Sequence, residues 1–388
     1  MLDHLSLFPA TKEQAVESRL RSYESWGRPY GVPIEGYLDR KNTMAGLEMA
    51  AEGRWTSWVL APRDDPETLD FMCSCETLRR EVIVYQKDNS DSTDLWKEEK
   101  IGYGVASVYT LPKNRGKGYA RHMMRLLHWV LASPSAFPSP FPEAWGKAPA
   151  VPEGLGQGVV SVLYSDVGSQ FYKACGPCPG ADGWMAAPHI ITTWSMETTL
   201  QESGPASTQD KWRLVGKDKL KEIIDGDSEL IVEEAPTLES PDAQTAFTFL
   251  PRKGLAEYLY RKIDWYLDQM TVPPQQWGIE STAGYPGRND FAIWTFELLP
   301  NSPKTLLITR LRCQKDALSE MLAQIAVYAK QIGIERIQIW NLPEGLKDEA
   351  GKTGAESAPA EEHLASVKWY GGEPSSVEYL HNEKFAWC

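Results

Sequence analysis

The chain has 388 residues, which favours two domains because a typical domain holds about 150. Hydrophobic residues make up 42% and charged residues 24%, and this globular composition excludes a disordered chain. The 53 Asp and Glu outnumber the 40 Lys and Arg, and a net charge of −13 argues against nucleic acid or an anionic membrane as the partner.

The N-terminus and the cysteine content bear on the compartment. The first residues, Met1-Leu2-Asp3-His4, do not begin a signal peptide, and no apolar run approaches the length of a bilayer span. Six cysteines in a chain of this length suit a reducing interior better than a disulfide scaffold. We therefore expect a cytoplasmic protein.

The first half of the chain is predicted to alternate helices and strands. Its segments, in chain order, are a helix at 11–26, an apolar run at 57–61, strands within 71–85 and at 101–111, an amphipathic helix from 120, a strand at 159–164 and a short helix at 167–175. Residues 87–100 are predicted to form a hairpin tip, and the Pro- and Gly-rich stretch 133–158 a loop.

A polar stretch at 198–210 predicts a linker between two domains. We therefore expect a first domain at 1–200, a linker at 201–210 and a second domain at 211–388. The second domain is predicted to contain a helix at 253–270, strands at 291–299 and 305–312, a helix at 316–332, a strand at 336–340, a loop at 345–362 and a last strand within 377–387. Both halves are typical of mixed α/β (α+β) units, and the pattern leaves open whether one repeats the other.

A β-rich run leads through a proline and two glycines into the helix after residue 118. Its residues are Val108-Tyr109-Thr110-Leu111-Pro112-Lys113-Asn114-Arg115-Gly116-Lys117-Gly118-Tyr119-Ala120. Successive backbone N–H groups of 115–120 can point at one spot beside the positive end of the helix, as a pyrophosphate needs. Gly116 and Gly118 allow close approach, and an ordinary strand-to-helix turn is the alternative. The segment lacks the Gly-Lys-Ser/Thr of a Walker loop and the third glycine of the dinucleotide fingerprint.

This segment resembles the acetyl-CoA-binding motif of the GNAT N-acetyltransferases, Arg/Gln-x-x-Gly-x-Gly/Ala. Downstream, Phe171-Tyr172-Lys173-Ala174-Cys175-Gly176 is similar to the Leu/Phe-Tyr-x-x-x-Gly signature of the same family. The resemblance covers much of the first 200 residues. It implies a GNAT fold, whose mixed central sheet splays apart at the strand 159–164, followed by a second C-terminal α/β domain. If that second domain is a degenerate GNAT-like unit, it has lost acetyl-CoA binding, since it contains no such motif.

The resemblance also implies the roles of individual residues. The implied acetyl-CoA-binding residues are Val108, Tyr109, Thr110, Arg115, Gly116, Lys117, Gly118, Tyr119 and Ala120. The first three would pair with the pantetheine arm and polarise the thioester, and the others would hold the pyrophosphate. Tyr172 would protonate the departing thiolate, with a packed core tyrosine as the alternative. No metal is implied.

The general base is left open by the sequence. Many family members carry an acid on the strand before the pyrophosphate-binding segment, which here is 115–120 and is called the cradle below. The corresponding strand, 101–111, contains no acid. Glu76, Asp166 or a chain of water molecules are the alternatives. The family often has Asn seven residues before the tyrosine, where this chain has Ser165.

Two further groups of residues have functional alternatives that we do not favour. Cys175-Gly176-Pro177-Cys178 has the letters of a redox centre, but it ends a predicted helix, whose dipole disfavours a thiolate there. A zinc site that adds Cys73 and Cys75 would need contacts that the sequence does not predict. His122 and His128 are expected to be packed or solvated rather than catalytic.

The layout of the whole chain looks like the two-domain fungal lysine N-acetyltransferases. This resemblance implies transfer of the acetyl group of acetyl-CoA to the side-chain amine of lysine, by direct attack in a ternary complex. The alternatives are a polyamine or a secondary-metabolite amine as acceptor, or a non-catalytic acyl-CoA-binding protein. The expected partner is a small-molecule amine, and the oligomeric state is left open. The second half is expected to wall the acceptor pocket with aromatic and acidic residues, including Asp264, Asp268, Glu280 and Asp290.

Overall fold

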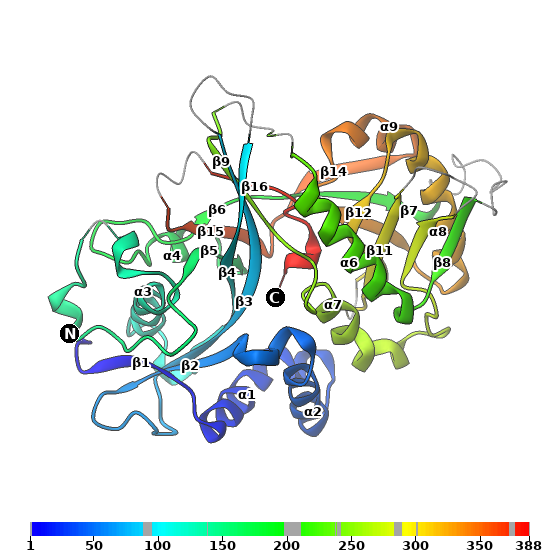
Figure 1. Cartoon of the computed structure of the whole chain (residues 1–388). Helices are drawn as coiled ribbons and strands as arrows, with labels where there is room; N and C mark the ends of the chain where they lie inside the picture. Colours follow the sequence, from blue (N-terminus) through cyan, green and yellow to red (C-terminus); the bar gives the residue numbers. More distant parts are fainter. Residues whose placement is uncertain are drawn as a thin grey trace.

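The computed structural model describes residues 2–87, 95–137, 139–197, 211–236, 238, 242–282, 289–299, 302–371 and 377–387. They form two lobes, each built around a mixed β-sheet (Figure 1). The predicted linker at 198–210 lies outside the described residues, as does half of the predicted hairpin tip, at 88–94, while its other residues belong to strands that end at Lys87 and begin at Leu95. Among the helices of the described ranges, none has both the length and the apolarity needed to cross a bilayer.

In the described part of the chain, the first sheet has nine strands. Its main path is β1-β2-β3-β4-β5-β15-β6, and β9 pairs with β3 and also with β16. The strands are β1 (Leu5–Pro9), β2 (Trp55–Pro62), β3 (Cys73–Lys87), β4 (Leu95–Tyr109), β5 (Gly158–Ser165), β6 (Met185–Ala186), β9 (Thr245–Phe249), β15 (Leu364–Trp369) and β16 (Val377–Tyr379). Within the main path β4 and β5 run parallel, and the other neighbours run antiparallel.

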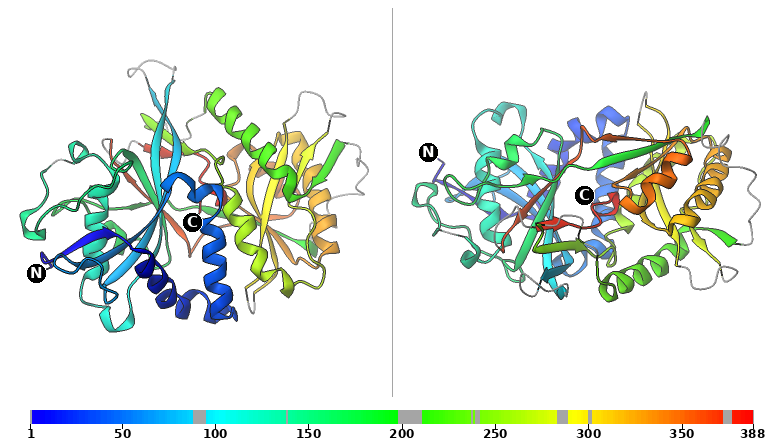
Figure 2. Two further views of the ribbon diagram at one scale, coloured as in Figure 1. Left: turned by 60° about the horizontal axis from the view of Figure 1, so that its bottom comes forward. Right: turned by 90° about the horizontal axis from the view of Figure 1, so that it is seen from above.

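Helices cover both faces of this sheet. On one face, α3 (Tyr119–Leu131) buries Met123 and Leu127 in a cluster with Tyr103 and Val105 of β4. The other face turns towards α1 (Lys12–Trp26), α2 (Ile34–Ala45) and the second lobe (Figure 2). The predicted helix at 11–26 is confirmed, because Thr11 and Gln14 form a capping box at its start. The short α4 (Gln170–Lys173) lies close to α3.

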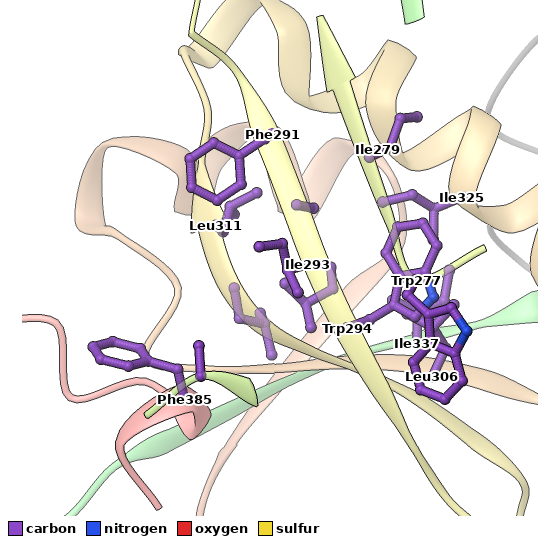
Figure 3. Close-up of a cluster of buried hydrophobic side chains, with 14 of the residues drawn as sticks. Trp277, Ile279, Phe291, Ile293, Trp294, Leu306, Leu311, Ile325, Ile337 and Phe385 are labelled. Atoms are coloured by element: carbon purple, nitrogen blue, oxygen red, sulfur yellow. The ribbon is translucent and has the colours of Figure 1, made fainter. Parts of the chain in front are cut away.

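The second sheet comprises, among the residues described, seven strands in the order β14-β7-β13-β12-β11-β10-β8. They are β7 (Ile190–Ser195), β8 (Trp212–Val215), β10 (Gly278–Ser281), β11 (Phe291–Glu297), β12 (Thr305–Arg312), β13 (Arg336–Trp340) and β14 (Ala355–Pro359). The helices of this lobe are α6 (Lys217–Glu233), α7 (Glu257–Lys262), α8 (Leu318–Gln331) and α9 (Lys347–Lys352). Its core is rich in large apolar side chains, among them Trp277, Trp294 and Phe385 (Figure 3).

Short 3-10 helices complete the described chain. They are Arg28–Tyr30, Glu48–Gly53, Pro112–Asn114, Pro134–Ala136, Glu143–Trp145, Ile263–Gln269, Lys315–Ala317, Glu344–Leu346 and Lys384–Ala386. The helix expected at 253–270 is thus divided between α7 and a 3-10 helix. The expectation of a loop at 345–362 is wrong, because α9 and β14 lie within it.

The two lobes exchange strands across the expected linker. β7 precedes the linker but pairs with β13 and β14 in the second sheet. Conversely, β9, β15 and β16 follow the linker and complete the first sheet. A domain boundary at 201–210 therefore remains a proposal that concerns the sequence. In space, each sheet contains strands from both sides of this boundary.

Candidate active site

The first sheet opens between its two parallel strands. Pairing of β4 with β5 runs from Ile101–Gly158 to Val105–Leu163 and continues no further, although β4 extends to Tyr109. The pairing of β4 with β3 shifts its register in the same region, and Ser107 has a φ of 53°. Such a bulge bends a strand and leaves backbone groups unpaired. The splayed sheet implied by the family resemblance is therefore present, with its opening at Ala106–Tyr109.

Beyond this opening the chain forms the loop predicted to be a cradle. Gly116 and Gly118 have φ values of 75° and 83°, which side chains rarely adopt. Asn114 is buried and donates a 3.2 Å hydrogen bond to the carbonyl of Met72, which anchors the loop. Arg115 Nε donates to the Thr110 carbonyl at 3.1 Å.

The loop ends at the solvent-exposed N-terminus of α3. Gly118 is the N-cap of α3, and among the described residues no side chain caps the first turn through a hydrogen bond. The backbone N–H groups of that turn therefore point outwards at the positive end of the helix dipole. Gly116, Lys117 and Gly118 are exposed, and a Cβ added at Gly116 would meet no described atom within 4 Å. This arrangement can receive an anion such as a phosphate.

Tyr172 lies on α4, in the cluster beneath α3. Its ring makes edge contacts with Phe171 and Trp184, at centroid distances of 5.0 and 6.4 Å. Burial raises the pKa of Tyr172, and the neighbouring Cys175, Cys75 and Asp166 raise it further. Within the described chain its hydroxyl has no hydrogen-bond partner. The phenol is thus kept protonated and free to donate.

Two carboxylates lie at the opening of the sheet. Glu76 on β3 pairs with Ala106, the first residue of β4 beyond its pairing with β5, and is 8% exposed. Its Oε2 lies 3.1 Å from Lys41 Nζ. Asp166 follows β5 directly and lies 2.7 Å from His363 Nδ1. Although burial opposes it, the hydrogen bond from His363 lowers the pKa of Asp166.

The second lobe faces this opening with aromatic rings and cations. The ammonium of Lys262 lies 3.9 Å from the ring centroid of Trp387. The ammonium of Lys384 lies 4.1 Å from the ring of Trp340 and 4.6 Å from that of Trp387. Trp340 and Trp387 thus lie beside two lysines, of which Lys384 also lies 3.4 Å from Glu297. That these residues wall an acceptor pocket stays a prediction.

The acids expected in that wall have other partners. Asp264 forms an ion pair with Lys217, and Glu280 lies 2.5 Å from Arg213. Asp290 is buried and accepts a 2.7 Å hydrogen bond from the N–H of Gln314. The side chain of Asp268 lies outside the described part of the structure. Each of the three acids that can be placed therefore already has a partner, and their role in an acceptor wall stays a prediction.

Four cysteines and two histidines that the sequence singled out are buried in the fold. Cys73, Cys75, Cys175 and Cys178 are buried free thiols, and burial raises the pKa of each. Among the described residues, no group of three or more His, Cys, Asp or Glu could hold a metal ion. Burial lowers the pKa of His122 to about 4 and that of His128 to about 3. His128 bonds the hydroxyl of Tyr370 and the carbonyl of Cys175.

A cavity of about 550 Å³ lies between the lobes, on the face of the first sheet opposite α3. Its walls include Leu78 and Arg80 of β3, Ile101 of β4, and Tyr258 of α7. The Tyr258 ring lies 6.2 Å from that of Trp387, so the cavity adjoins the aromatic wall. Sequence reasoning missed this cavity because residues 250–258 close it from the other half of the chain.

Comparisons with known proteins agree with this geometry. Residues 195–388 match the family described as "LYC1 GNAT-like C-terminal domain". A "Lysine acetyltransferase" of Yarrowia lipolytica is 26% identical over 196 residues, which are 50% of this chain and 43% of that protein. The chain thus matches less than half the length of this relative.

Solved structures share the fold over nearly the whole chain. A GCN5-related N-acetyltransferase from Kribbella flavida is 11% identical, with a TM-score of 0.52 over 95% of this chain and 72% of that one. One from Anabaena variabilis is 12% identical, with a TM-score of 0.51 over 94% and 73%. A probable N-acyltransferase from Enterococcus faecalis is 12% identical, with a TM-score of 0.52 over 95% and 72%. The family match and the shared fold lead to one conclusion: the chain belongs to the GNAT N-acetyltransferases, in the family of LYC1-like proteins.

Proposed function

We propose that the protein is an acetyl-CoA-dependent N-acetyltransferase and that its acceptor is the side-chain amine of lysine. One observation carries the proposal: a single segment, 106–120, contains an open strand edge followed by an uncapped helix start. A strand edge can pair with the amides of a pantetheine arm, and a helix start can bind a pyrophosphate. Acetyl-CoA carries both groups in that order.

The cradle would bind the pyrophosphate through its backbone. The positive φ values of Gly116 and Gly118 let the chain turn so that the N–H groups of 116–120 face outwards. Arg115 and Lys117 are exposed beside them and add positive charge. Tyr119 and Ala120 occupy the first helical positions, where backbone N–H groups lack partners inside the helix.

The open edge of β4 would hold the pantetheine arm. Val108, Tyr109 and Thr110 follow the bulge at Ser107, beyond the last pairing of β4 with β5. Tyr109 is buried against Trp26, at a centroid distance of 5.6 Å, which fixes this edge in place. The acetyl thioester supplies an electrophilic carbonyl beside this edge.

Tyr172 would act as the general acid and Glu76 as the general base. Because its pKa is raised, Tyr172 retains its hydroxyl proton at neutral pH and can donate it to a thiolate leaving group. Glu76 is the buried carboxylate nearest the sheet opening by register, and it would accept the proton of the attacking amine. The raised pKa values of the buried thiols of Cys73, Cys75 and Cys175 disfavour them as nucleophiles. Direct attack by the amine is therefore the route that we propose.

Lysine is proposed as acceptor because the relative from Yarrowia lipolytica carries that activity in its name. A cytoplasmic setting is proposed because the five described cysteines are all free thiols. The test is release of free CoA from acetyl-CoA in the presence of lysine, ornithine or spermidine, with mass spectrometry of the product. We expect the fastest release with lysine and acetylation on its side-chain nitrogen. Tight binding of acetyl-CoA without release in the presence of any amine would instead support a non-catalytic acyl-CoA-binding protein.

A further inference from the structure

Three basic side chains from distant parts of the chain converge beside the opening of the first sheet. Arg40 of α2 is 6% exposed, and its Nη1 lies 2.5 Å from the hydroxyl of Tyr266. Lys262 and Lys384 both place their ammonium groups over the ring of Trp387, at 3.9 and 4.6 Å from its centroid. Tyr266 follows Lys262 by four residues, so Arg40 and the two lysines belong to one cluster.

This cluster carries more positive charge than its neighbours neutralise. Within the described chain Arg40 and Lys262 have no carboxylate within 4 Å, and Lys384 has a single ion pair, 3.4 Å from Glu297. The next cation, Lys41, is already paired with Glu76. Burying cations without acids is unfavourable unless an anion completes the site.

The electrostatics support a missing anion. Burial lowers the pKa of Lys262 well below its usual value, and the charges of Arg40, Lys384 and Lys41 lower it further, with Glu297 opposing them. The pKa of Lys384 is also lowered by burial, although Glu297 and Asp166 oppose this. A bound carboxylate would reverse both effects, because an opposite charge favours the protonated form of an amine.

The position of the cluster relates it to the acceptor rather than to acetyl-CoA. Its lysines adjoin Ile263, Phe385 and Ala386, which pack in the core cluster of the second lobe, whereas α3 packs in a separate cluster. Arg40 belongs to the cluster, and the next residue, Lys41, pairs with Glu76 at the sheet opening. The cluster therefore adjoins the sheet opening. An acceptor with a carboxylate at one end and an amine at the other would match this arrangement, with its carboxylate at the basic cluster and its amine at Glu76.

We propose that Arg40, Lys262 and Lys384 form a subsite for the carboxylate of the acceptor, so that the enzyme uses amino acids with a terminal side-chain amine and discriminates against diamines. This inference rests on the proposed acetyltransferase function. It assigns to the second lobe a role in choosing the acceptor by its acid group.

The test compares three acceptors that differ by one group at a time: lysine, 6-aminohexanoate, which lacks the α-amine, and 1,5-diaminopentane, which lacks the carboxylate. The wild-type enzyme should use lysine and 6-aminohexanoate well and the diamine poorly. Lys262→Met should lower kcat/KM for both carboxylates by about 10- to 100-fold, since a hydrogen bond between charged groups contributes on this scale. The kcat/KM of this variant for the diamine should equal that of the wild type.

A matched control is Lys217→Met. Lys217 also lies over a tryptophan, with its ammonium 4.0 Å from the Trp277 ring, but it is paired with Asp264. This variant should leave the ratio of lysine to diamine turnover unchanged. The melting temperature gives an independent readout: Lys262→Met should keep or raise it, because the lost ammonium has no acid partner among the described residues.

The outcomes separate the two proposals. Equal wild-type use of lysine and 1,5-diaminopentane, or an equal loss for both in Lys262→Met, would overturn the carboxylate subsite while leaving acetyl transfer established. Absence of acetyl transfer to every amine would instead overturn the proposed function. If Lys262→Met does not fold, Lys262→Gln, measured in the same way, decides the question, since glutamine keeps a polar side chain without the charge.

Discussion

The guanidinium of Arg80 donates a 2.6 Å hydrogen bond to the carbonyl of Ala386. A strand of the first sheet thereby holds the segment that brings Lys384 and Trp387 to the junction of the lobes. The contact depends on Gly104 of the neighbouring strand, because a Cβ there would lie 2.6 Å from Arg80 Cζ. Arg80 and Gly104 together position one wall of the candidate acceptor site.

Gly104→Ala should therefore disturb the acceptor end of the site and spare the acetyl-CoA end. The added methyl group displaces the guanidinium, and overpacking of this kind costs about 1–3 kcal/mol of folding free energy. We expect a higher KM for the amine with unchanged affinity for acetyl-CoA, measured by steady-state kinetics and calorimetry. The control is Gly226→Ala in α6, where a Cβ meets no described atom within 4 Å and both constants should stay the same. An unchanged amine KM in Gly104→Ala would show that this contact does not shape the site.

Glu76→Gln should slow the chemical step. It keeps the size of the side chain and removes its capacity to accept a proton, so kcat should fall by about 100-fold, within the usual range of general base catalysis. Binding of acetyl-CoA, followed by calorimetry, should not change. Asp166→Asn is the matched comparison, because Asp166 is the other carboxylate at the opening and is paired with His363. A larger loss of kcat in Asp166→Asn than in Glu76→Gln would transfer the role of base to Asp166.

Tyr172→Phe should remove the general acid and keep the ring contacts with Phe171 and Trp184. We expect kcat to fall by about 100-fold, with acetyl-CoA affinity unaltered. Because burial raises the pKa of Tyr172, the wild-type phenol stays protonated up to at least pH 10, about the value for a free tyrosine. Its loss should thus reduce kcat by the same factor at every pH from 7 to 9. A variant with wild-type kcat would leave Tyr172 as a packing residue.

The sequence predicted the elements whose signals are local. Thr11 and Gln14 begin a helix within one turn of chain, and Gly116 and Gly118 impose a turn through their own backbone. These features need no distant partner. The helix at 11–26 and the glycine turn could be predicted from the sequence, although the part of Gln14 in the capping box was not predicted. The strands β7 and β15 could not be assigned to their sheets in this way, because each pairs with residues on the other side of the expected linker, more than 140 positions away.

The charge at the proposed acceptor site could not be predicted from the sequence, for a related physical reason. Acidic residues are frequent in the second half, but whether an acid faces a ligand depends on the base that it already pairs with. Lys217 neutralises Asp264 and Arg213 neutralises Glu280, whereas Lys262 has no such partner in the described chain. Only the fold reveals which charges remain unpaired.

A buried ion network should dominate the stability of the second lobe. Arg310, with 4% of its side chain exposed, lies 2.7 Å from Asp227 and 2.5 Å from Glu383. Arg310→Met would leave two buried carboxylates without this partner and should lower the free energy of unfolding by about 3–5 kcal/mol. Arg213→Met breaks an exposed ion pair instead and should cost at most about 1 kcal/mol. Urea denaturation of both variants checks the difference, and equal losses would contradict it.

The cradle gives the most direct test of the account as a whole. Gly118→Asp places a carboxylate and a strained backbone at the start of α3, where we propose that the pyrophosphate binds. Gly180→Asp adds the same charge and a similar strain, since Gly180 has a φ of 81° and open space around it, but it lies outside the cradle. A non-glycine residue in this conformation costs about 1–2 kcal/mol, so both variants should remain folded.

The decisive measurement is calorimetric titration of the wild type and these two variants with acetyl-CoA, each first verified as folded by its melting temperature. The account predicts that the wild type and Gly180→Asp bind acetyl-CoA with similar affinity and that Gly118→Asp loses binding. Equal affinity in all three proteins, or no binding by the wild type, would contradict the assignment of the β4–α3 segment as the acetyl-CoA site.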